Sequence, residues 1–117
     1  MDLTKIIQTF KNHPDYHKMG MIASHLGVVR ENSLNGRTVR GIEIVFDRDM
    51  IDKIISETKE MQGIYQVMVE VSEGKLEVGD EIMAVVVGGD TREHVFPALI
   101  ETVNRIKAQG GRKKEIF

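Results

Sequence analysis

Basic side chains are concentrated near the end of the chain, where their types and spacing could support chemistry on an anion. Residues 105–117 read RIKAQGGRKKEIF, with five of the 16 lysines and arginines and one acid. This segment carries a formal charge of +4, whereas the whole chain carries −2. A lysine beside other cations has a lowered pKa, so its amine can act as a base or nucleophile. The Gly110-Gly111 pair can reverse the chain so that Lys107 and Lys113 face one pocket.

Three interpretations of this basic segment compete. Charge runs are usually solvated, and a site for single-stranded nucleic acid needs aromatic side chains among the cations. Only Phe117 follows the cluster, and the sequence pI of about 6.1 is far below the range typical of nucleic-acid-binding domains. We therefore expect no nucleic-acid binding, which leaves a solvated tail or an anion and nucleophile site.

A second candidate anion site lies in VVGGDTRE, residues 86–93, where an apolar run, two glycines and a helix start follow one another. Backbone N–H groups at a helix start can bind an anion, but a tight strand-to-helix turn explains the pattern equally well. The segment lacks the Gly-Lys-Ser/Thr signature of a P-loop.

The four histidines are interpreted as surface residues, because their spacing supplies no metal-ligand set: His13, His17, His25 and His94.

The composition limits the classes of function that remain. At 117 residues the chain is expected to form one domain, residues 1–117. The absence of cysteine excludes disulfides, thiolate metal ligands and a cysteine nucleophile. The first residues do not resemble a signal peptide, and no stretch approaches the ~20 apolar residues of a membrane helix. We expect a cytoplasmic protein that binds no membrane, metal or cofactor.

Hydrophobic periodicity predicts three helices and four strands. The helices are predicted over residues 2–12, 48–62 and 90–107, the first capped by Asp2 and the last by Asp90 in a capping-box-like start. The strands are predicted over residues 19–30, 38–47, 64–71 and 82–89, the first two as a hairpin and the last as a buried central strand. Residues 72–81 are predicted to be a turn region. This order predicts an α+β domain with helices packed on a mainly antiparallel sheet.

Glycine and proline refine these elements. Gly20 and Gly27 are expected to mark a bulge or a close backbone approach in the first strand. Pro97 is expected to kink the last helix or to mark a later start. The buried face of that helix is expected to comprise Val95, Phe96, Leu99, Ile100, Val103 and Ile106.

Four motifs, in the same order and with nearly preserved spacing, resemble the large, catalytic subunit of molybdopterin synthase. They are GVVREN (27–32), LEVGDEIMAVVV (76–87), TREHVFPA (91–98) and RIKAQGGRKKE (105–115). The resemblance covers residues from about 20 to 115. It implies a fold of the α/β-hammerhead type.

The resemblance implies sulfur transfer in molybdenum cofactor biosynthesis. In that family a small ubiquitin-like carrier brings sulfur as a thiocarboxylate on its C-terminal Gly-Gly. Two sulfurs are added to cyclic pyranopterin monophosphate, which forms the dithiolene of molybdopterin. The large subunit usually forms a homodimer with one carrier at each end, a heterotetramer. Because this chain has no cysteine, any sulfur is expected to come from a partner. Because both of its Gly-Gly pairs are internal, the chain is not expected to be the carrier itself.

The resemblance also implies roles for single residues. Lys107 matches the family's helix lysine, and Lys113 matches its second essential lysine if the turn is one residue shorter. Both are expected to be catalytic: Lys107 polarises or attacks the thiocarboxylate, and Lys113 binds substrate and transfers protons. Lys114 takes the place of Lys113 if the turn is aligned without a gap. Substrate contacts are expected from Arg30, Arg92, Thr91 and Lys114.

Several positions depart from the family pattern, among them Thr91 and Arg112, and they keep a second function open. The family commonly has His-Arg where this chain has Thr91-Arg92, so a histidine that could relay protons is absent there. Arg112 stands where an aromatic residue is usual. A sulfurtransferase subunit therefore competes with a non-catalytic relative that binds a ubiquitin-like partner or an anionic ligand. The matches at Lys107, Lys113, Arg30 and Arg92 favour the enzyme.

Overall fold

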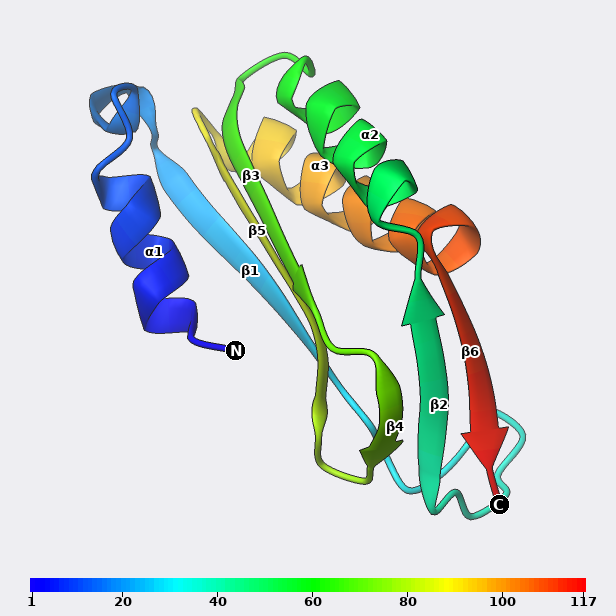
Figure 1. Cartoon of the computed structure of the whole chain (residues 1–117). Helices are drawn as coiled ribbons and strands as arrows, with labels where there is room; N and C mark the ends of the chain where they lie inside the picture. The colour runs from blue at the N-terminus through cyan, green and yellow to red at the C-terminus, as the bar shows by residue number, and fades with distance from the viewer.

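The computed structural model describes residues 1–117 and arranges six strands in two antiparallel sheets (Figure 1). The first sheet has the order β1-β5-β3 and the second has the order β4-β2-β6. The strands are β1 (Met21–Val28), β2 (Gly41–Phe46), β3 (Ile64–Val71), β4 (Gly74–Glu77), β5 (Glu81–Gly89) and β6 (Gly111–Ile116). The helices are α1 (Leu3–Lys11), α2 (Arg48–Lys59) and α3 (Arg92–Arg105), with a 3₁₀ turn at Tyr16–Lys18 and a π-helical turn at Ile106–Gly110. The predicted α+β class is confirmed.

The central strand β5 is apolar on both faces because both faces are covered. Its residues Met83, Val85 and Val87 belong to the main core with α2 and α3. The alternate residues Ala84 and Val86 pack in a second core with α1. Figure 1 shows α1 on one side of this sheet and the α2–α3 pair on the other. The prediction of a buried central strand from the continuous apolar run at 82–89 is therefore confirmed.

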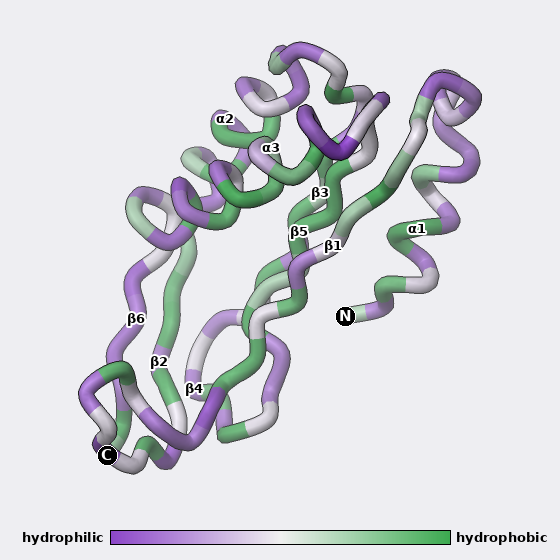
Figure 2. The backbone as a smooth tube through the Cα atoms, turned by 180° about the vertical axis from the view of Figure 1, so that it is seen from behind, coloured by the Kyte–Doolittle hydropathy of each residue, from purple (hydrophilic) through white to green (hydrophobic).

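The first two helices begin at aspartate caps. At the start of α1, Asp2 accepts a hydrogen bond from the Lys5 N–H at 3.1 Å, as predicted. At the start of α2, Asp47 accepts one from the Met50 N–H at 3.1 Å. Figure 2 shows that both helices carry hydrophilic segments next to hydrophobic ones, the pattern of helices that cover a core. No helix combines the length and the apolar character that a bilayer span requires.

The predicted hairpin between the first two strands is wrong. β1 pairs with β5, and β2 pairs with β4 and β6, so the two strands belong to different sheets. The predicted turn region contains the short strand β4, and the basic segment contains β6. The sequence pattern missed β4 and β6 because both are short and carry mostly polar side chains. In the second sheet only the central strand β2 has a strand signal of its own, and both of its neighbours were missed.

The last helix differs from the prediction at its start and on its buried face. Its N-cap is Thr91 rather than Asp90, and Pro97 lies inside the helix, so the predicted later start is wrong. Phe96 and Ile100 are 49% and 60% exposed. Val95, Val103 and Ile106 are buried as predicted, and Ala98 and Thr102 occupy further core positions. The buried Thr102 hydroxyl donates to the Ala98 carbonyl at 2.7 Å and lies 3.1 Å from the Thr58 hydroxyl, so its polar atom is satisfied.

Gly20, just before β1, and Gly27, within β1, show the close approach and the irregular pairing that were predicted for them. A Cβ at Gly20 would overlap the carbonyl oxygen of Asp90, so only glycine permits this approach of the two chain segments. The pairing register of β1 and β5 shifts between Gly27 and Val28, which is the irregularity expected there. This shift marks the end of β1 next to the candidate site.

Candidate active site

A pocket of about 550 Å³ lies where the first sheet, the second sheet and the end of α3 meet. Its volume is within the range of small-molecule sites. Most of its lining is apolar and includes Val28, Ile44, Phe46 and Met83. Three cationic side chains, those of Arg30, Lys107 and Lys113, also line it. The pocket thus combines an apolar wall with positive charge from three separate segments.

Lys107 reaches the pocket because the chain changes its helical pitch after α3. The π-helical turn Ile106–Gly110 follows the helix directly, and such turns are frequent at functional sites. Ile106 is fully buried and anchors the start of the turn. At its end, the Gly110 carbonyl accepts a hydrogen bond from the Asp47 N–H at 2.8 Å. Lys107 itself is exposed and borders the pocket.

Lys113 reaches the same pocket through the register of β6 against β2. Gly111 pairs with Phe46 and Lys113 with Ile44, and all four residues line the pocket. Successive side chains of a strand point to opposite faces. Lys114, which pairs with Glu43, therefore lies on the other face of β6 and does not line the pocket. The chain reversal expected at Gly110-Gly111 thus brings Lys113, and not Lys114, to Lys107.

Arg30 is held by the segment that follows β1. The neighbouring Val29 is buried, its N–H donates to the Asp80 carbonyl at 2.9 Å, and its carbonyl accepts from the Gly79 N–H at 2.8 Å. These contacts tie the end of β1 to the turn between β4 and β5. No acidic side chain lies within ion-pair distance of Arg30, Lys107 or Lys113. Their charges are therefore free to bind an anion.

Thr91 and Arg92 lie at the opposite end of α3 from this pocket. At a rise of ~1.5 Å per residue, Arg92 and Lys107 are about 22 Å apart along the helix. Arg92 is exposed and lies 3.5 Å from a carboxylate oxygen of Glu93. Within one protomer the structure does not bring Thr91 or Arg92 to the three cations.

The turn between β5 and α3 holds an acidic side chain rather than an open anion site. The carboxylate of Asp90 accepts hydrogen bonds from the Thr91 N–H at 2.6 Å and from the His94 ring nitrogen at 2.7 Å. The hydrogen bond from His94, aided by that from Thr91, keeps the pKa of Asp90 below its usual value. The Gly88–Gly89 pair is packed against Phe10 and the Gly63 carbonyl. These contacts favour the interpretation of VVGGDTRE as a tight turn.

His25 is the residue that sequence reasoning missed. It was predicted to be a surface histidine, but it is half-buried and its Nδ1 is buried without a hydrogen-bond partner. Burial, and then the nearby charge of Lys107, lower its pKa. The alternation of β1 places it on the face that α3 covers, a signal that becomes informative only once the covering helix is known.

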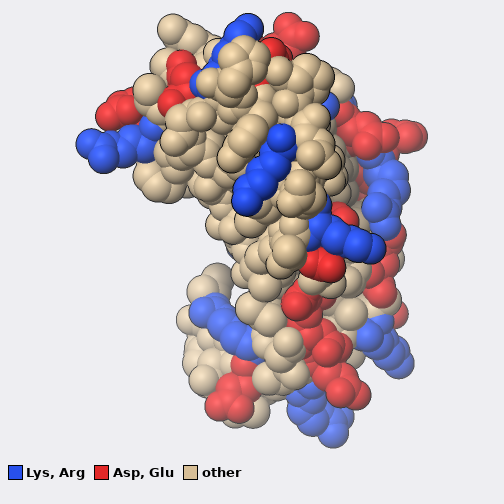
Figure 3. Space-filling view, turned by 90° about the vertical axis from the view of Figure 1, so that its left-hand side faces the viewer, with Lys and Arg blue, Asp and Glu red and all other residues tan.

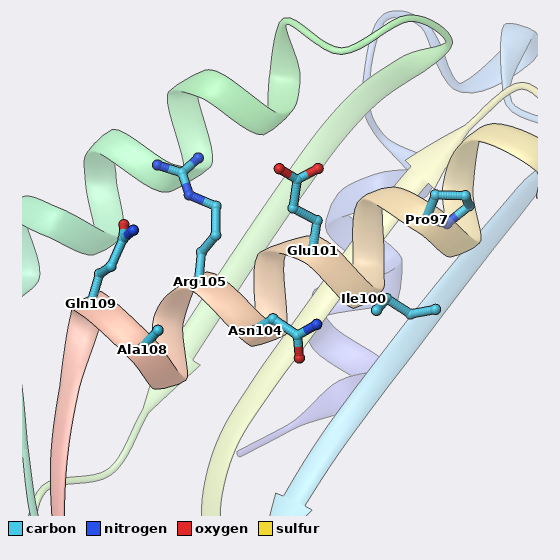
Figure 4. A pocket seen from close by; sticks show the side chains of 7 residues that line it. All are labelled: Pro97, Ile100, Glu101, Asn104, Arg105, Ala108 and Gln109. Carbon is cyan, nitrogen blue, oxygen red and sulfur yellow. The ribbon is translucent and has the colours of Figure 1, made fainter.

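A second depression lies on the outer side of α3 and its π-helical turn (Figure 4). Its lining includes Pro97, Ile100, Asn104, Arg105 and Gln109. The Arg105 guanidinium is already paired with Glu57 at 3.2 Å. No group of three or more His, Cys, Asp or Glu side chains is placed to hold a metal ion anywhere in the chain. The cationic pocket is therefore the candidate site.

Comparison with solved structures finds the same fold in several proteins. Molybdopterin cofactor biosynthesis protein E from Burkholderia multivorans ATCC 17616 is 25% identical with a TM-score of 0.79, covering 98% of this chain and 80% of that one. Molybdopterin synthase from Staphylococcus aureus is 23% identical with a TM-score of 0.73, covering 86% and 76%. A complex of subunits 1 and 2 of the molybdopterin-converting factor from Helicobacter pylori 26695 matches at 16% identity with a TM-score of 0.71, covering 100% and 84%. No curated protein matches this chain.

The fold and the pocket together define a small α+β protein with clustered cations in a pocket between two sheets. Residues 1–109 match the profile of the MoaE protein family. The chain therefore belongs to this family, which is the large-subunit family of molybdopterin synthase. The resemblance inferred from the four motifs is confirmed, and membership supports a role in molybdopterin biosynthesis.

Proposed function

We propose that this protein is the catalytic subunit of a molybdopterin synthase. It takes sulfur from the C-terminal thiocarboxylate of a small ubiquitin-like carrier and adds it to cyclic pyranopterin monophosphate, which gives the dithiolene. The observation that carries this proposal is the convergence of Arg30, Lys107 and Lys113 on one pocket. Lys107 and Lys113 lie on either side of the Gly110-Gly111 turn, whereas Arg30 comes from a segment far from both in the sequence.

The pocket suits both reactants of this reaction. The carrier tail and the pterin phosphate are anionic, and the three cations have no acidic partners within the chain. The guanidinium of Arg30 can bind a phosphate or carboxylate in a bidentate manner. Apolar side chains such as Phe46 and Ile82 supply a surface for a flat ring system. The absence of cysteine agrees with sulfur arriving on a partner.

The two lysines are assigned different roles. Lys107, at the π-helical turn, polarises the thiocarboxylate carbonyl or attacks it as a free amine. Lys113, on the facing strand, binds the substrate and transfers protons. Lys114 lies on the opposite face of β6, so the alternative alignment that would give it the role of Lys113 is disfavoured.

The remaining expected contacts imply a second copy of the chain. Because Thr91 and Arg92 lie about 22 Å from Lys107 along α3, they can contact bound substrate only in the pocket of another protomer. We therefore propose a homodimer that carries one small subunit at each end. The Helicobacter pylori structure named above is a complex of two different subunits, which supports a small-subunit partner. We assign the assembly to the cytoplasm.

A non-catalytic binding protein remains the competing function, favoured by Thr91 in the place of the family histidine. Nucleic-acid binding is disfavoured, because basic and acidic side chains are interspersed on the face shown in Figure 3 and the pI is about 6.1.

The deciding experiment mixes the protein with a thiocarboxylated carrier and cyclic pyranopterin monophosphate and measures the dithiolene that forms. Sulfur transfer with turnover supports the enzyme. Tight carrier binding without dithiolene supports the binding protein.

A further inference from the structure

His25 lies in β1 two residues before Gly27, which lines the cationic pocket on the side of the first sheet. Alternate residues of β1 point to the face that α3 covers, where Met21 and Ala23 pack against the main core. His25 follows on the same face, opposite Val85 of β5. Gly27, the next residue on this face, lines the pocket, and a Cβ placed on it would lie 3.7 Å from Cε1 of His25. The imidazole therefore lies directly behind the pocket wall.

The imidazole has an unused hydrogen-bonding atom on a buried edge. Nδ1 of His25 is buried and has no partner, whereas nearly all buried polar atoms in native proteins have one. The pKa of His25 is lowered by burial and by Lys107, the one charged group that acts on it. The ring is therefore neutral near pH 7, and one of its nitrogens is an acceptor.

Lys107 is suited to be the missing partner. It takes part in no ion pair or side-chain hydrogen bond, although its charge acts on His25. Its four-carbon stem is flexible, so its amino group can sample several positions at the pocket. Hydrogen bonds in a site without ligand are often unmade and form only in the complex. A bound ligand would restrict the amine to one of these positions.

We propose that His25 is a positioning residue of this pocket: its Nδ1 accepts a hydrogen bond from the Lys107 amino group and orients that amine toward the bound ligand. The ring proton then resides on Nε2. A carboxylate in this place would stabilise the ammonium form of Lys107. A neutral imidazole can hold the amino group by a hydrogen bond without placing a negative charge beside it. This inference rests on the proposed function of Lys107.

The contact can be tested without turnover. The His25 imidazole is titrated by ¹H–¹³C NMR in the wild-type protein, in Lys107→Met and in the control Lys53→Met, which changes an exposed side chain of α2. Because the Lys107 charge lowers the pKa of His25, Lys107→Met is expected to raise it toward 6.5, and Lys53→Met should leave it unchanged. An identical His25 titration in the wild-type and Lys107→Met proteins overturns the proposal.

The functional consequence is tested with two substitutions of different chemistry. His25→Phe keeps a ring but removes the acceptor, whereas His25→Asn keeps a hydrogen-bonding group near the place of Nδ1. We expect His25→Phe to lower kcat for dithiolene formation about tenfold, a loss typical of one hydrogen bond, with KM unchanged. His25→Asn is expected to restore most of this loss. Full activity of His25→Phe, or equal loss in both variants, overturns the proposal.

The two tests separate this inference from the function on which it rests. A wild-type protein that makes no dithiolene refutes the proposed function, while the NMR titration still decides the His25–Lys107 contact. An active wild-type protein with an unaffected His25→Phe variant refutes the role of His25 alone. Thermal unfolding of each variant identifies any loss of activity that comes from loss of the fold.

Discussion

Lys107→Ala is the sharpest test of the proposed site, because the side chain can be removed without disturbing the turn that presents it. The turn is held by the fully buried Ile106 and by the hydrogen bond from the Asp47 N–H to the Gly110 carbonyl. Neither contact involves the exposed Lys107 side chain. We therefore expect the free energy of unfolding to change by no more than ~0.5 kcal/mol, the usual range for a surface substitution.

The expected loss of activity is far larger than this change in stability. Loss of a general acid–base or nucleophilic group costs at least ~100-fold, which corresponds to about 2.7 kcal/mol in the barrier. Arg30 and Lys113 remain in the pocket and keep two of its three cations. Affinity for the anionic substrate should therefore fall much less than kcat, because binding and reaction depend on different members of the cluster.

The assay measures dithiolene formation with a thiocarboxylated carrier and cyclic pyranopterin monophosphate, with Lys53→Ala as the control. Lys53→Ala changes an exposed lysine of α2 and should behave like the wild-type protein. Lys113→Ala should lose activity to a similar extent, and Lys114→Ala should lose less than Lys113→Ala. If Lys107→Ala and Lys113→Ala both kept full activity, the catalytic assignment would be wrong, and the basic segment would be a solvated strand.

Three further predictions concern the start of α3. Arg92→Ala is expected to weaken binding of the pterin precursor or the carrier tail by about 1.5–3 kcal/mol, the effect of a lost charge-assisted hydrogen bond. Calorimetry measures both affinities, and unchanged values for both ligands would exclude Arg92 from the site. Thr91→His should change the rate by less than about tenfold, or ~1.4 kcal/mol in the barrier, if another group moves the proton; a larger rise would show that a histidine at this position relays protons. The pKa of Asp90 is lower in the folded state than its ordinary value of 3.8, so the unfolded state binds more protons at acid pH. The stability that Asp90 contributes is therefore fully present above about pH 3.8. It is lost as the pH falls through the lower pKa of the folded state. Urea unfolding between pH 5 and pH 3 should therefore show a steeper loss for the wild-type protein than for Asp90→Asn, and equal slopes would contradict this.

Local patterns in the sequence were sufficient for several elements. The stripe of apolar residues in α2 and the Asp2 cap of α1 depend on neighbours within one or two helical turns, so they can be predicted from the chain alone. The run at 82–89 indicated a strand covered on both faces, which is β5. The Gly110-Gly111 pair also indicated that the chain could reverse there, and in the structure Lys107 and Lys113 line one pocket.

Tertiary structure alone decided which segments are neighbours. The pairing of β2 with β6 joins residues about seventy positions apart, and this register, with its alternation of faces, separates Lys113 from Lys114. Helix length places Arg92 far from Lys107 although both flank the same helix. His25 became significant only when the end of α3 was found to cover its strand face. Such contacts depend on how distant surfaces pack, and no local periodicity in the sequence encodes them.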